Sequence, residues 1–279
     1  MDKLQISGDE DLYYKEGKGP VEGTTSLLSS NSKWLNSAVL RDLFGQEMLR
    51  RNGHDIGVLQ LVPEAMNEYH RLLDDAEVDR MINRDRARQP DFAALLDSRR
   101  LTILDLDAAD RYADGTLGAR LRDFYRATGF NQVLAYKGVV PANDYQHYTM
   151  VRTLIHDVEH LVTGFGTDPA GELGMMYLYM TLNSRYFSPE LAGVMNFNHA
   201  YLSSTWMMRT DLYYPGVTLA FLEAMKVGLE MGNRMKRPMP LEDWERLFEL
   251  PIETVREELG VTPAADPAAW RWTEEAWRG

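Results

Sequence analysis

Apolar residues recur along most of the chain at intervals of three and four, which is the spacing of one face of an α-helix. An early example is the run Val39, Leu40, Leu43, Phe44, Met48 and Leu49. Gly53 follows this run and is the expected stop of that helix. No stretch of useful length alternates in the manner of a β-strand, and no repeat of solenoid length appears. The pattern therefore predicts an all-α fold class.

The other boundaries come from capping signals and periodicity. Further helical segments are expected over residues 64–86, 114–129, 143–164, 215–234, 241–250 and 251–260. Asp168-Pro169 and Ser188-Pro189 each join an N-cap residue to a proline at the first helical position, so each predicts a helix start. Residues 101–107 are expected to be an extended piece or a linker.

Composition divides the chain into three parts. Residues 1–33 are rich in Gly, Ser, Thr and charge, which predicts a flexible N-terminal arm. Residues 34–262 are expected to form a single multi-helix domain. Residues 263–279 form a Trp-rich C-terminal tail, which either packs on the domain or meets a membrane interface.

Charge and cysteine content exclude several function classes. Asp and Glu outnumber Lys and Arg by 42 to 30, and the net charge of −12 argues against a nucleic-acid partner. The chain has no cysteine, so disulfides, thiolate catalysis and Cys-rich zinc fingers are excluded. The N-terminus has no apolar signal core, and the longest uncharged run, residues 191–208, is too polar for a lipid-spanning helix. A soluble, cytoplasmic protein that can lie peripherally on a membrane surface is expected.

One segment carries specific chemistry, His156-Asp157-Val158-Glu159-His160. A helix turns by about 100° per residue, so His156 and His160 lie one turn apart on one face. Asp157 falls within the same arc. Glu172 follows a glycine-rich turn, early in the helix predicted to start at Pro169, and a short connection makes the two helices antiparallel neighbours. The four residues predict a metal site between two adjacent helices.

The types of donor atom limit the identity of the metal. Imidazole and carboxylate suit zinc, ferrous iron or manganese, and zinc is favoured. The segment resembles the HExxH zinc helix, but Asp157 is a methylene shorter than glutamate and is poorly placed as a general base. Asp157 is therefore interpreted as a ligand or as a group that orients one. The ordinary alternative is a surface helix that carries two histidines by chance.

Two other classes of metal-binding protein share part of this motif. An HD-type phosphohydrolase needs a further upstream histidine and a distant aspartate, for which His147 and Asp211 are available. A ferritin-like di-metal site needs two Glu-x-x-His motifs, and the chain has none. The first class stays open, and the second is excluded.

The segment after the motif is apolar nearly all round. Its large residues are Leu173, Met175, Met176, Tyr177, Tyr179 and Met180, and Met195, Phe197, Trp206, Met207 and Met208 continue this character. Met and aromatic surfaces adapt to flexible apolar ligands, so a groove is one interpretation. A buried core helix is the favoured one. Arg152 and His199 are candidates for contact with a polar head group.

At these residues the sequence resembles the Coq-four family of ubiquinone (coenzyme Q) biosynthesis proteins. That family carries His-Asp-x-x-His, eleven residues and then Glu, and the stretch from Leu161 to Gly171 gives the same spacing. The turn Gly115-Thr116-Leu117-Gly118, Trp244-Glu245 and the segment 255–261 also resemble family elements. The resemblance covers roughly residues 100–262.

The resemblance implies a metal-dependent enzyme that removes the ring carboxyl carbon of a prenylated hydroxybenzoate by oxidative decarboxylation. It also implies an isoprenoid-lipid ligand, for which Arg152, Met176, Tyr179 and His199 are the candidate substrate-binding residues. The alternative is a non-catalytic prenyl-lipid-binding scaffold that organises other ubiquinone-pathway enzymes at the membrane. A homo-oligomer is expected in either case.

Overall fold

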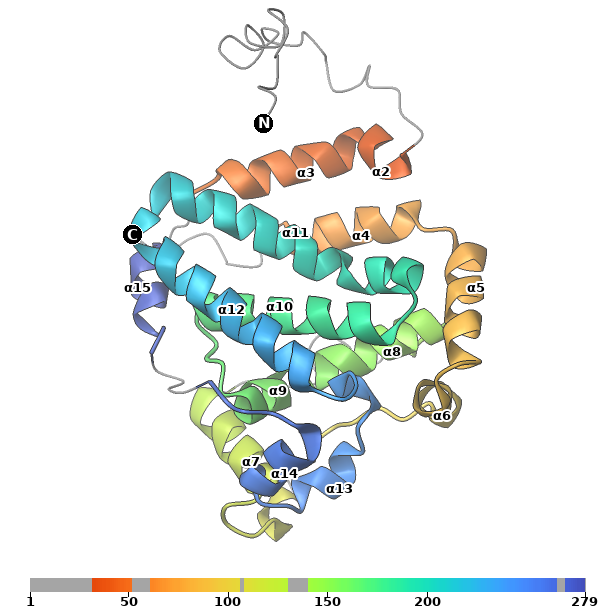
Figure 1. The fold of residues 1–279 in the computed structure, drawn as a ribbon, viewed down its shortest axis with the longest axis vertical. Helices are drawn as coiled ribbons and strands as arrows, with labels where there is room; N and C mark the ends of the chain where they lie inside the picture. The colour runs from red at the N-terminus through yellow and green to blue at the C-terminus, as the bar shows by residue number, and fades with distance from the viewer. Residues whose placement is uncertain (1–31, 52–60, 106–107, 130–139, 265–268, 279) are drawn as a thin grey trace, which may run out of the picture.

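The computed structural model describes residues 32–51, 61–105, 108–129, 140–264 and 269–278. These residues form fourteen α-helices and no β-strand, which confirms the all-α prediction; Thr116 and Pro251 make an isolated β-bridge (Figure 1). Within these ranges, no helix has the length and apolarity needed to cross a bilayer. The predicted arm lies almost entirely outside the described residues, as does Gly53.

The N-terminal helices cover one end and one side of the molecule (Figure 1). Their bounds are α2 Lys33–Asn36, α3 Ala38–Leu49, α4 Val62–Leu72, α5 Asp75–Arg86 and α6 Pro90–Ser98. The charged region expected over residues 64–86 is thus two helices. The second begins after its N-cap residue Asp74, whose side chain accepts a hydrogen bond from the backbone N–H of Glu77 at 3.1 Å.

Two expected boundaries differ in the middle of the chain. Helix α7 (Leu117–Thr128) begins after Thr116, not Asp114, because the Thr116 hydroxyl accepts the capping bond from the N–H of Ala119. The single helix expected over residues 143–164 is interrupted at Ile155, which separates α8 (Asp144–Leu154) from α9 (His156–Thr163). Ile155 has φ −94° and ψ 0°. Apolar periodicity continues across this residue, so the pattern could not reveal the break.

Three long helices form the centre of the fold: α10 (Pro169–Tyr186), α11 (Pro189–Tyr213) and α12 (Thr218–Arg234). Helix α10 packs against both of the others. The contact with α12 is close at Gly228, where a Cβ atom would lie 2.1 Å from the carbonyl oxygen of Gly174. Because both residues lack a side chain, the two backbones can approach and bury the apolar surface of α10.

The C-terminal residues return to the centre. Helices α13 (Trp244–Phe248) and α14 (Ile252–Leu259) lie beside α7 and α9 respectively, and α15 (Trp272–Arg278) contacts α10. Trp270 and Trp277 are buried in the main hydrophobic core, whereas Trp272 is half exposed. The two buried indoles pack this tail on the helical domain.

The apolar interior consists of two clusters. The main core includes Val158 on α9 and Tyr179 on α10. A smaller core joins α5, α6, α8 and the start of α11, and it includes Tyr148 and Met195. Polar residues of α8 to α11 lie where these two cores meet, and they form the candidate site.

Candidate metal centre and adjoining pockets

His156, His160 and Glu172 converge. The two histidines lie on α9, and Glu172 lies in the first turn of α10. His156 Nε2 is 3.4 Å from Glu172 Oε2, and His160 Nε2 is 3.2 Å from Glu172 Oε1. One potential ligand atom of each residue lies within 4.8 Å of those of the other two. Three of the four predicted ligands therefore meet at one point.

The loop between the helices is built to turn back sharply. Gly164 ends α9 with a φ of +74°, a conformation that favours glycine. Asp168 then caps α10, since its side chain accepts a hydrogen bond from the N–H of Gly171 at 3.1 Å. A Cβ atom on Gly171 would lie 2.1 Å from the carbonyl oxygen of Gly166. The loop can thus pack on the first turn of α10, and Glu172 faces α9.

The ring of His160 is held by a backbone contact. Its Nδ1 lies 3.1 Å from the carbonyl oxygen of Phe165, so Nδ1 carries the donated proton and Nε2 faces Glu172. This Nε2 is buried and makes no aligned hydrogen bond with any described residue, although Glu172 is close. His160 and Glu172 are thus close but not aligned for a hydrogen bond, as expected of two side chains that bind the same ion. A backbone carbonyl that accepts from the other ring nitrogen is also typical of metal-bound histidine.

The charges of the cluster also fit a cation. Burial by itself lowers the pKa of His156, but the Glu172 and Asp157 carboxylates outweigh it and raise this pKa to about 10. Burial raises the pKa of Glu172, and the two histidines outweigh that and hold it well below its ordinary value. The site thus stabilises positive charge between α9 and α10. Imidazole and carboxylate donors match zinc, ferrous iron or manganese.

Asp157 lies outside the converging group. Its Oδ1 is 3.7 Å from His156 Nδ1, the nitrogen that faces away from Glu172. A carboxylate in that place fixes the tautomer and orientation of a ligating imidazole. Asp157 also adjoins Tyr125, whose hydroxyl pKa is raised by burial and by this carboxylate. Direct ligation by Asp157 stays a prediction.

The residues needed by the phosphohydrolase alternative lie elsewhere. His147 is buried, with its Nε2 3.0 Å from the carbonyl oxygen of Arg100. Asp211 accepts a hydrogen bond from the Thr218 hydroxyl. Neither belongs to the converging group, and the described residues supply the metal-ligand set of His156, His160 and Glu172 alone.

A cavity of about 220 Å³, here called the inner pocket, lies at the junction of the two cores. Three of the four predicted substrate-binding residues line it, namely Arg152, Tyr179 and His199. The fourth, Met176, does not line this cavity and is buried in the main core. Aromatic and aliphatic walls come from several helices and include Met66, Tyr69, Val194, Met195 and Phe197.

Several polar atoms that line the inner pocket are buried without hydrogen-bond partners among the described residues. They include the Tyr179 hydroxyl, both ring nitrogens of His199 and the Nε of Arg152. The Arg152 guanidinium lies 4.4 Å from the centre of the Tyr179 ring, on which His199 stacks at 5.1 Å. Buried polar atoms are normally paired, so this concentration of exceptions makes the inner pocket a candidate binding site.

The inner pocket and the metal cluster influence each other electrostatically. Burial lowers the pKa of His199 well below its ordinary value, and the charges of Arg152 and His156 lower it further. His199 is therefore a neutral imidazole, with one donor and one acceptor nitrogen. Arg152, on α8, precedes His156 by four residues and carries the positive charge of the pocket.

Sequence reasoning missed three residues. Asn183 and Asn198 line the inner pocket, and each has a buried amide oxygen without a hydrogen-bond partner. Glu159 is fully buried with both carboxylate oxygens unpaired, and burial raises its pKa to about 7 against the opposing charges of Arg152 and His156. In the sequence, the signal that could have identified these residues is an amide or an acid on an otherwise apolar helix face.

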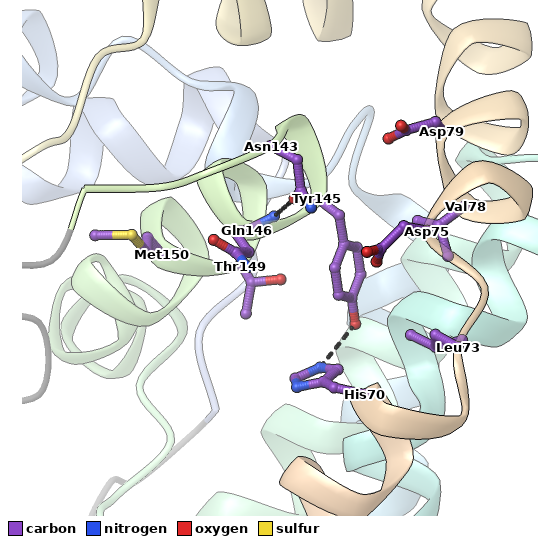
Figure 2. Close-up of a pocket in the computed structure, with 10 residues that line it drawn as sticks. All are labelled: His70, Leu73, Asp75, Val78, Asp79, Asn143, Tyr145, Gln146, Thr149 and Met150. Carbon is purple, nitrogen blue, oxygen red and sulfur yellow. Dashed lines mark hydrogen bonds between the residues drawn. The ribbon is translucent and has the colours of Figure 1, made fainter.

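A second cavity of about 320 Å³, the outer pocket, adjoins the inner one. The two cavities share His70, Tyr145 and Thr149. Figure 2 shows the His70 ring meeting the Tyr145 hydroxyl, at 3.3 Å, with Asp75 and Asp79 on the α5 side. The shared residues separate a wider, acidic-rimmed space from the cavity that contains Arg152.

Comparison with known proteins establishes a likeness of fold. No protein-family model matches the chain, and no curated protein matches its sequence. A crystal structure of a Nostoc punctiforme protein, described provisionally as a ubiquinone biosynthesis protein, superposes with a TM-score of 0.59. The match covers 80% of this chain and 97% of the Nostoc chain, at 21% sequence identity. The chain therefore shares its helical fold with that protein.

Proposed function

We propose that this protein acts in ubiquinone biosynthesis, as a metal-dependent enzyme that removes the ring carboxyl carbon of a prenylated hydroxybenzoate. The observation that carries the proposal is the convergence of His156, His160 and Glu172, with His156 close enough to Arg152 of the inner pocket for their charges to interact. The motif spacing and the fold shared with the Nostoc protein support the same pathway.

The pocket residues suit an aromatic acid. Arg152 offers a guanidinium to a carboxylate, and the walls formed by Tyr69, Phe197 and Met195 suit a flat ring. A divalent ion held by His156, His160 and Glu172 would supply Lewis acidity to a ring oxygen. Burial of Tyr179 and His199 keeps the reacting end away from bulk water. The carboxyl group would leave as carbon dioxide, and a hydroxyl group would take its place on the ring. The hydroxyl oxygen would come from dioxygen, with two electrons from a reductant, or from water, with two electrons passed to dioxygen or another acceptor.

The number of ligands bears on the alternative of a non-catalytic scaffold. Structural zinc sites are closed by four protein ligands, whereas catalytic sites use three and keep one position for water or substrate. Three protein ligands converge in the described residues. This count favours the enzyme over the prenyl-lipid-binding scaffold.

The test begins with metal content, measured by mass spectrometry on protein purified without chelators. We expect about one divalent ion per chain, and its loss in the double variant His156→Ala, His160→Ala. His147→Ala is the matched control, because His147 is a buried histidine of α8 outside the cluster.

The metal-loaded protein is then incubated with 3-geranyl-4-hydroxybenzoate under air, with and without an added reductant, and carbon dioxide release is followed. We expect release by the wild-type protein and by His147→Ala, and none by the double variant. A folded protein that holds no metal would overturn the metal site. A metal-loaded protein that releases no carbon dioxide would move the assignment to the scaffold.

A further inference from the structure

The amide side chains of the inner pocket bear on which substituents its ligand carries. We infer that Asn183 and Asn198 are specificity residues whose amide oxygens accept hydrogen bonds from ring hydroxyls, so that the pocket selects a free phenol over its methyl ether. The inference deepens the proposed function, since it names the feature of the aromatic ligand that the pocket recognises.

The orientation of Asn183 follows from its neighbours. Asn196 donates through its Nδ2 to the carbonyl oxygen of Met180 and to the Ser184 hydroxyl, so its Oδ1 is the free acceptor. Asn183 Nδ2 donates to that Oδ1 at 2.9 Å. The Asn183 amide is thereby held in one orientation, with its nitrogen used and its oxygen available.

The remaining oxygen is costly to leave unpaired. Asn183 is 2% exposed, lines the inner pocket, and its Oδ1 meets no donor among the described residues. The Oδ1 of Asn198, from α11, has the same buried and unpaired state in the same cavity. Because solvent does not reach either oxygen, water does not supply the missing hydrogen bonds, and a ligand hydroxyl that contacts them would supply the donors.

The other groups of the pocket define the rest of the ligand. Tyr69 and Phe197 stack at 3.6 Å with an interplanar angle of 7°, which gives the cavity a flat aromatic wall. Arg152 supplies a cation, whereas the amides and the neutral His199 supply uncharged polar atoms. This combination fits a planar ring with an anionic substituent and at least one hydroxyl, and it disfavours a ring whose oxygens are all methylated.

The experiment compares 3-geranyl-4-hydroxybenzoate with its 4-methyl ether by titration calorimetry, on metal-loaded wild-type protein and on the metal-site double variant. We expect the phenol to bind at least about tenfold more tightly than the ether, because the ether leaves a buried acceptor unpaired. In Asn183→Leu, and separately in Asn198→Leu, the preference should fall to about twofold, with affinity for the ether unchanged or higher.

Asn83→Leu is the matched control, since Asn83 is an exposed asparagine of α5 and should leave the preference intact. Asn198→Leu keeps the inference falsifiable if Asn183→Leu fails to fold, because Asn198 has no bond to the Asn196 network. Equal binding of the two probes to wild-type protein overturns the inference. An equal loss of affinity for both probes in the leucine variants also overturns it.

Failure here is distinguishable from failure of the proposed function. Carbon dioxide release without a preference for the phenol refutes the role of the amides alone. A preference for the phenol that depends on the amides, without carbon dioxide release, refutes the reaction alone.

Discussion

Two of the buried polar side chains of helix α11, Arg209 and His199, have opposite surroundings. Arg209 is fully buried and donates to both the carboxylate and the backbone carbonyl of Glu47, while its guanidinium lies 5.2 Å from the centre of the Trp277 ring. His199, ten residues earlier, is equally inaccessible, but neither ring nitrogen has a partner among the described residues. The Arg209 region fastens α11 to α3, whereas the His199 region leaves both ring nitrogens without a described partner.

The contrast distinguishes buried polar groups that stabilise the fold from buried polar groups that are available for binding. A paired buried charge contributes to stability only through its partner, and removal of that partner leaves an uncompensated charge. An unpaired buried group already carries its desolvation cost in the free protein, so its removal costs little stability. Stability and binding should therefore respond to substitution in opposite ways in the two regions.

The largest effect is expected at the paired charge. Glu47→Gln should lower the free energy of unfolding by about 3–5 kcal/mol, because Arg209 would remain buried without its counter-ion. Urea unfolding measures the change. The double variant Glu47→Gln, Arg209→Met should recover most of the loss. A loss below about 1 kcal/mol in the single variant would contradict the structural role of the pair.

A substitution of the unpaired buried acid Glu159 is expected to increase stability. Glu159→Gln removes a buried carboxylate that has no described hydrogen-bond partner and keeps the side-chain shape. It should raise the free energy of unfolding of the metal-free protein at pH 8 by about 1–3 kcal/mol. Urea unfolding beside the wild-type protein tests this. A destabilised variant would show that Glu159 has a structural partner.

A smaller change is expected at His199. His199→Phe keeps the stack on Tyr179 and removes two unpaired nitrogens, so the free energy of unfolding should change by less than about 1 kcal/mol. The same variant should bind 3-geranyl-4-hydroxybenzoate at least about tenfold more weakly. Parallel losses of stability and binding would place His199 with Arg209 as a structural group.

The smallest effect concerns acid stability at the α3–α4 contact. Hydrogen bonds from Arg71 and Ser37 lower the pKa of Glu68 to about 2, against the effect of burial. A depressed carboxyl pKa stabilises the fold above about pH 4.5, and the contribution is lost as pH falls toward 2. It should amount to on the order of 1 kcal/mol, because Arg71 is two-thirds exposed.

Glu68→Gln should therefore reduce stability at pH 6 and flatten its decline between pH 5 and about 2. Thermal unfolding across this range measures both. Asp42→Asn, at an exposed acid on α3, is the control and should leave the decline unchanged. A variant that declines as steeply as the wild-type protein would refute the contribution of Glu68.

The convergence of His156, His160 and Glu172 was predictable because the three residues lie within one short segment. Spacing along α9 and the turn before α10 fixed which side chains could meet, without knowledge of the tertiary fold. The inner pocket combines Tyr69, Asn183 and Asn198 from three helices, and no local pattern relates them. Their roles depend on helix packing. The break at Ile155 was equally hidden, because its residue type suits a helix interior.

The packing of the C-terminal residues on the loop between α9 and α10 makes the order of synthesis matter for that loop. Trp270 stacks on Phe165 at 5.9 Å, and the Thr273 hydroxyl donates to Asp168, the cap of α10. The carbonyl oxygen of Phe165 in turn orients His160. His156, His160 and Glu172 precede Trp270 by about a hundred residues, so a nascent chain contains them well before it contains Trp270. The proposed metal site should therefore be complete only when Trp270 and Thr273 are present, and a chain truncated before Trp270 should retain metal less well than the full chain.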